Sequence, residues 1–134
     1  PMILETTYNK RETIQQINQL VGKPYTLIQR LRMGGIGSKR MGISKISPEF
    51  AHYLKAGHYV THANIELRPE GILIHFRFKL ESYAWPMPYT GLEVATDPEL
   101  TFTADGKFIA FKEGMKVNGP FIERMIRHMA AKKQ

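Results

Sequence analysis

The sequence predicts an α+β domain in which an antiparallel sheet is closed by a C-terminal amphipathic helix. Apolar and polar residues alternate over residues 72–80, which is typical of a strand with one buried face. Short strand-like segments separated by turn residues follow up to residue 112. A helix that opens at Asn118 then carries apolar residues on one face, and this face is expected to lie on the sheet. Those residues are Phe121, Ile122, Met125, Ile126 and Met129.

Helical signals come first along the chain. Asn9 and Glu12 have the spacing of a capping box, in which each side chain bonds a backbone N–H at the start of a helix. Gly22 is expected to end this helix. Its apolar stripe consists of Ile14, Ile17, Leu20 and Val21.

Two shorter helices are expected before the sheet. Residues 25–33 are compatible with a strand or with a helix capped at Thr26, and we favour the helix. Its inward-facing residues would be Leu27, Ile28 and Leu31. Ser47 and Pro48 match the cap and first position of a second helix, which Gly57 would end.

The expected strands are joined by turn signals. They cover residues 59–67, 72–80, 83–85, 92–95, 100–103 and 107–112. Residues 68–71 form the turn between the first two, and Asp105-Gly106 is a pair favoured in hairpins. Pro86 and Pro88 are expected to interrupt the ladder, because proline has no N–H to donate.

The composition bounds the class of protein. The 134 residues include 43% hydrophobic and 23% charged side chains, which is ordinary for a globular domain. The absence of cysteine excludes disulfides, thiolate metal sites and a cysteine nucleophile. The sequence has no apolar run of membrane-spanning length, and its first residues do not have the pattern of a secretory signal, so we expect a cytoplasmic protein. We expect no cofactor.

Positive charge is concentrated in the first part of the chain. The net charge is +7, and residues 1–58 carry nine basic residues against three acidic ones. Residues 59–134 carry ten against nine. A one-sided basic surface favours phosphate-bearing partners such as nucleic acid or anionic lipid, although solubility alone is an equal explanation. We therefore divide the chain into a basic, helical N-terminal extension (1–57) and a sheet-forming part (58–134).

Residues 33–45 combine four glycines with basic residues. Backbone N–H groups of such a stretch can converge on a phosphate, although neither a Walker motif nor a dinucleotide-binding fingerprint is present. The alternative is a flexible or hairpin-forming connector, which we favour. The residues of the candidate anion site are Arg30, Arg32, Lys39, Arg40 and Lys45.

Polar residues also gather on the outer face of the predicted hairpin. His62 and His75 should lie near each other there, with Asn64 and Arg77 beside them. A metal site would need a third ligand, for which Glu66 is the only nearby acid. We favour exposed polar strand residues over a metal site.

Three aromatic residues flank the two prolines of the predicted sheet. Tyr83, Trp85 and Tyr89 are compatible with a surface that binds a peptide or protein, or with a plug at the end of a barrel. No Ser-His-Asp order or pair of carboxylates indicates catalysis.

Residues 58–131 resemble the bacterial pleckstrin-homology-like and GRAM-type domains. The resemblance rests on the strand pair ANIELRPEGILIHFRF, on WPMPYTGLEV at mid-sheet, and on LTFTADGKFIAFKEG running into the helix FIERMIRHM. It implies a partly closed barrel with a binding or scaffold role. The family's phosphoinositide site uses a basic loop between the first two strands, and the short, acidic turn at 68–71 does not match it.

These observations lead to one expected function and two alternatives. We expect a non-enzymatic binding or scaffold domain whose partner is another protein or a second copy of the chain. The first alternative is binding of nucleic acid or an anionic lipid surface through residues 30–45. The second is an enzyme that uses Pro1, because Pro1-Met2-Ile3 resembles the start of tautomerases.

Overall fold

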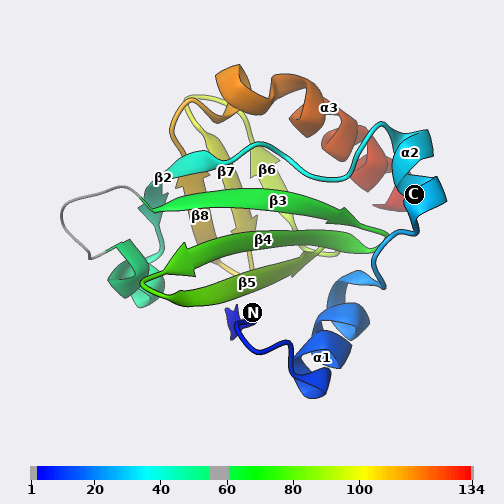
Figure 1. Ribbon diagram of the computed structural model, residues 1–134. Coiled ribbons are helices and arrows are strands. Elements are labelled where there is room, and N and C mark those ends of the chain that lie inside the picture. Colours follow the sequence, from blue (N-terminus) through cyan, green and yellow to red (C-terminus); the bar gives the residue numbers. More distant parts are fainter. Residues whose placement is uncertain (1–2, 55–60, 134) are drawn as a thin grey trace.

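The computed structural model describes residues 3–54 and 61–133. In this part of the chain, eight strands form one antiparallel sheet, with three α-helices and a short 3-10 helix around it (Figure 1). The strands are β1 (Leu4–Glu5), β2 (Met41–Ile46), β3 (His62–Arg68), β4 (Gly71–Phe78), β5 (Glu81–Pro88), β6 (Glu93–Ala95), β7 (Leu100–Ala104) and β8 (Lys107–Phe111). The helices are α1 (Arg11–Val21), α2 (Leu27–Met33), η1 (Pro48–Leu54) and α3 (Gly114–Lys133). The α+β class, the antiparallel sheet and the C-terminal helix are confirmed.

The strand order is β1-β5-β4-β3-β2-β8-β7-β6, and β2 joins the two halves of the sheet. Met41 and Gly42 pair with β3, whereas Ile43 to Ile46 pair with β8 after a shift in register. Figure 1 shows β6, β7 and β8 crossing behind β3, β4 and β5. The expected partly closed barrel is wrong in one respect: β1 and β6 lie at open edges, so the sheet does not close into a barrel. Residues 3–54 contribute three helices and also two strands.

One hydrophobic core lies between the two halves of the sheet and α3. Alternate residues of β3, β4 and β5 point into it, as the period of two predicts. Phe121, Ile122 and Met125 cover it from α3, which confirms the predicted apolar face of this helix. Each such side chain contributes about 1.5–3 kcal/mol when fully buried. The largest fully buried side chains include Trp85, Phe102, Phe111, Met41, Ile65 and Leu67.

The Gly-rich segment before β2 is fixed along β3. The N–H of Leu67 donates to the carbonyl oxygen of Ile36 (2.8 Å), and the N–H of Ile65 donates to Oγ of Ser38 (2.8 Å). The segment therefore continues the ladder that β2 forms with β3. The glycines predicted a flexible or hairpin-forming connector. The segment is instead held against β3 by these hydrogen bonds.

α3 anchors the same segment at its kink. The helix begins at Gly114, one turn earlier than predicted, and bends at Asn118, which has non-helical φ and ψ. The buried Asn118 amide accepts a hydrogen bond from the N–H of Lys39 and donates one to its carbonyl oxygen, both at 2.9 Å. This reciprocal pair fixes the chain just before Arg40.

Pro86 and Pro88 do not interrupt β5, contrary to the prediction. The N–H of Ser82 donates to Oγ1 of Thr7 and its carbonyl oxygen accepts from Thr6, so Ser82 directs its backbone groups toward β1. Residues an even number of positions apart on a strand share this direction, and Pro86 and Pro88 lie four and six positions after Ser82. Both prolines therefore turn their nitrogen toward the edge of the sheet, where β1 no longer follows and no donor is required.

α1 begins without the predicted capping box. Asn9 lies in the left-handed region (φ 50°) and Lys10 is the N-cap, without a side-chain hydrogen bond. Gly22 ends the helix as predicted. Ile17 and Val21 pack against the outer face of the sheet, whereas the other two residues of the predicted stripe are exposed.

α2 has the predicted caps, but the face that was expected to point into the core is exposed to solvent. Thr26 and Gln29 form a capping box, and Gly34 ends the helix in the left-handed conformation. Arg124 of α3 donates to the carbonyl oxygen of Met33 (2.6 Å), which holds the end of α2. Residues expected to face inward are 63–74% exposed, because this short helix lies at the margin of the core (Figure 1). They are Leu27, Ile28 and Leu31.

Among the helices of residues 3–54 and 61–133, none has the length and apolar character needed to cross a membrane.

We predict that Gly71→Ala destabilises the fold by about 1–3 kcal/mol, because the new methyl group overpacks a closed site. It would meet the carbonyl oxygen of Met87 at 2.5 Å and Cα of Pro88 at 2.8 Å, and these backbone atoms cannot move aside easily. Gly37→Ala is the matched control, because nothing lies within 4 Å of its added methyl group. Urea unfolding of both variants measures the difference, and equal stability of the two would contradict the prediction.

Candidate functional site

The outer face of β3, β4 and β5 is only half covered. α1 packs on it through Ile17 and Val21, which contact Leu73 and Ala84. The part of the same face toward the other end of these strands carries polar and basic residues. Because this face points away from the main core, its side chains are available to a ligand.

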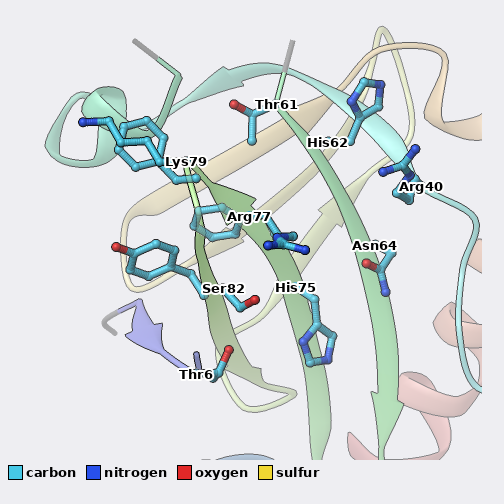
Figure 2. A pocket seen from close by; sticks show the side chains of 12 residues that line it. Thr6, Arg40, Thr61, His62, Asn64, His75, Arg77, Lys79 and Ser82 are labelled. Atoms are coloured by element: carbon cyan, nitrogen blue, oxygen red, sulfur yellow. The ribbon is translucent and has the colours of Figure 1, made fainter. Parts of the chain in front are cut away.

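A cleft of about 350 Å³ lies on the uncovered part of this face (Figure 2). Figure 2 shows Arg77 near the centre, with His62 and Arg40 on one side and Ser82 and Thr6 on the other. His75 and Asn64 also line the cleft, and both are labelled in this view. The basic side chains in the lining are Arg40, His62, His75, Arg77 and Lys79.

Strand register explains why these residues meet. Asn64 pairs with His75, and Arg77 pairs with Ser82, so their side chains point to the same face. His62 pairs with Gly42 of β2. Arg40 lies two residues before Gly42, and this spacing places it on the face of His62.

The positive charge of the cleft is not balanced from within. In the part of the chain that the structure describes, no acidic side chain lines the cleft. Arg40, His62 and Arg77 form no ion pair or side-chain hydrogen bond with any described residue. Lys79 lies over the ring of Phe78, with its nitrogen 5.3 Å from the ring centroid. A concave surface with one sign of charge concentrates ions of the opposite sign.

Glu66 holds the inner end of the cleft in place. Its Oε1 lies 2.7 Å from Nε2 of His75, and its Oε2 accepts from Nε of Arg68 at 2.6 Å. Burial raises the pKa of Glu66, but the hydrogen bonds from His75 and Arg68 outweigh it, so this pKa lies below its usual value. Arg68 also donates to Asn18 (3.1 Å) and to the carbonyl oxygen of Gly22 (2.8 Å). The carboxylate is therefore ionised, with Arg68 and His75 as its partners, and it orients the His75 ring.

A metal centre is not supported in residues 3–54 and 61–133, where no cluster of three or more potential ligands occurs.

The structure separates the five basic residues predicted to bind an anion. Arg40 lines the cleft, whereas Arg30 and Arg32 are exposed on α2. Lys39 and Lys45 are exposed outside the cleft lining. Figure 1 shows α2 and β2 at opposite ends of the segment that joins them, so these residues do not form one site.

The sequence placed His62, Asn64, His75 and Arg77 on one face correctly. It did not reveal that Arg40 joins them, because the pairing of β2 with β3 connects distant parts of the chain. The only available signal was the run of basic residues ahead of an alternating segment. The alternation of apolar and polar residues along a strand does not by itself distinguish a cleft from an ordinary polar face of a sheet.

The predicted aromatic surface is wrong at two of its three residues. Trp85 and Tyr89 are buried, since both point into the core. The ring of Phe50 packs edge-on against Trp85, with centroids 5.0 Å apart. Tyr83 is partly exposed, stacks on Phe76 and donates to Glu81 (2.7 Å), so only this residue remains at a surface.

Pro1, on which the tautomerase alternative depends, lies outside the described residues, as does Gly57 at the expected end of the second short helix.

Comparison of the chain with models of protein families, with curated proteins and with solved structures finds no match. The protein is therefore classified by its own fold and site alone. It has an open, bent antiparallel sheet with a cationic cleft on its outer face.

We predict that Glu66→Gln lowers the free energy of unfolding at pH 7 by roughly 1–3 kcal/mol, because Arg68 loses its charged partner. The folded-state pKa of Glu66 is lowered, so its contribution is complete above the pKa of an unfolded carboxyl group and is lost as pH falls through the folded value. The stabilities of the wild type and the variant should therefore converge toward pH 3. Urea unfolding between pH 7 and pH 3 measures this, with the exposed Glu93→Gln as control. A difference that stays constant with pH would contradict the prediction.

Proposed function

We propose that this chain is a binding domain whose outer sheet face takes a phosphate group. The observation that carries the proposal is the cleft in which Arg40, His62 and Arg77 converge without an acidic partner among the described residues. Arginine matches the geometry of phosphate oxygens with two parallel N–H bonds. Asn64 and Ser82 add neutral polar groups beside these charges.

The shape of the cleft favours a small molecule. Its volume of about 350 Å³ falls in the range of small-ligand sites. The hydrogen bonds of Glu66 fix His75 before any ligand arrives, so less ordering is required on binding. A nucleic-acid surface would instead be supported by a basic stripe along the backbone path, and the five basic residues of 30–45 do not form one.

A pleckstrin-homology-like relationship is part of this proposal. Seven consecutive antiparallel strands, β2 to β8, are followed by one helix, α3, that packs on the core. This order supports the resemblance over residues 58–131, and in this proposal the related part also includes β2. The turn at Pro69 and Glu70 is tight, which leaves the proposed ligand site on the strand face and not at the family's basic loop.

We expect inorganic phosphate to bind the intact chain and Arg77→Ala or Arg40→Ala to weaken this binding roughly 10- to 100-fold, because each removes charged hydrogen bonds. Titration followed by amide chemical shifts should place the largest changes on β3 and β4. Lys116→Ala is the control, since Lys116 is exposed on α3, outside the lining of the cleft. Equal weakening by all three variants, or no binding at low salt, would refute the proposal.

A second candidate function is docking of α2 on an anionic membrane surface. Leu27, Ile28 and Leu31 are exposed, and Arg30 and Arg32 lie on the same short helix, which has no acidic residue. Apolar side chains flanked by arginine suit an interface between lipid headgroups and acyl chains. The same charge disfavours a second copy of α2, although a partner protein or self-association remains the function expected from the sequence.

Vesicle cosedimentation tests this second candidate. The wild type should bind vesicles containing phosphatidylglycerol more than neutral phosphatidylcholine vesicles, and Leu27→Ser with Leu31→Ser should abolish the difference. Leu80→Ser is the matched control, because Leu80 is 84% exposed in a turn of the sheet. Binding that persists in the double variant would exclude α2. A dimer detected by sedimentation and lost in the double variant would assign this face to self-association.

A further inference from the structure

A second cavity of about 570 Å³ adjoins the cationic cleft. It lies where α1 meets the outer face of the sheet, and Thr6, His75 and Ser82 line both hollows. The two cavities therefore form one groove that runs along the outer face from Arg40 to α1.

The second cavity differs from the cleft in chemistry. Its apolar lining comes from Ile14, Ile17, Pro24 and Leu73, and its polar lining is mostly threonine and asparagine. Arg68 also lines it, but this guanidinium is committed to Glu66, Asn18 and Gly22. The cavity thus offers apolar contact and neutral hydrogen-bonding groups beside a site that is cationic.

We propose that the groove binds a single organic phosphate, with its phosphate in the cationic cleft and its uncharged part against α1. This inference rests on the proposed function, because the phosphate must occupy the cleft. The uncharged part has an apolar face, as an aromatic ring has, or an apolar face with hydrogen-bonding groups, as a sugar or a nucleoside has. The uncharged part of the ligand covers the side chain of Ile14, which is 44% exposed in the structure.

One hydrogen-bonded chain links His75, which lines both cavities, to Arg68 and Asn18, which line the second. It runs from His75 through Glu66 and Arg68 to Asn18 of α1. At the junction, Thr7 and Ser82 are joined by the hydrogen bond from the Ser82 N–H to Oγ1 of Thr7 (2.9 Å). The two halves of the groove are therefore held in a fixed relation, so two linked groups of one molecule bind more tightly than either group alone.

The test compares inorganic phosphate with phenyl phosphate, glucose 6-phosphate and adenosine 5′-monophosphate on the intact chain. At least one organic phosphate should bind ten or more times as tightly as inorganic phosphate in an amide chemical-shift titration. Ile14→Trp, which fills the second cavity, should remove this gain and leave the affinity for inorganic phosphate unchanged. Retained phosphate binding also shows that the variant is folded.

Leu20→Trp is the matched control, because Leu20 is 40% exposed on the same helix and lies outside the described lining of both cavities. It should keep the gain, and Thr13→Trp should repeat the loss from a second position in the lining. If no organic phosphate binds more tightly than inorganic phosphate, or if the gain survives both cavity-filling variants, the inference is overturned while the proposed function stands. If neither kind of phosphate binds, or if binding is insensitive to Arg77→Ala, the proposed function itself fails.

Discussion

The double pairing of β2 is the constraint on which the rest of the structure depends. Its first residues pair with β3 and its last with β8, and the register shift between Ile43 and Lys45 separates the two ladders. Such an irregularity bends a strand and increases its twist. The two halves of the sheet can therefore enclose one core while remaining hydrogen-bonded through a single strand. Without this pairing, β3 and β8 would each present an open edge.

The same bend determines what lies on the outer face. Since the core occupies the inner face, α1 is the element that covers the outer one, and its eleven residues reach only part of it. Arg68 is buried at their contact, where Glu66, Asn18 and the carbonyl oxygen of Gly22 compensate its charge. Buried charges are tolerated only with such partners. On the uncovered part of the face, Arg40, His62 and Arg77 have no such partner among the described residues.

Two surfaces carry features that do not stabilise the fold: positive charge in the cleft and exposed apolar residues on α2. Neighbouring cations such as Arg40 and Arg77 in the cleft repel one another, and a bound anion would relieve this repulsion and stabilise the fold. The apolar face of α2 is exposed, although the caps at Thr26 and Gly34 define the helix well. Local features that conflict with stability are expected where a protein binds something. The cleft supports the more specific proposal because its residues come from five separate segments: Thr6, Arg40, β3, β4 and β5.

Local patterns in the sequence determined the α+β class, the strands from β3 to β8, the turn at Asp105-Gly106 and the apolar face of α3, because each depends on residues close together in the chain. They also placed His62 and His75 on one face. Only the tertiary structure decided that β2 lies at the centre of the sheet, that α2 exposes its leucines, and that Arg40 reaches the outer face. Those outcomes depend on which distant segments pair, and the free energy of such pairing is not visible in any short stretch of sequence.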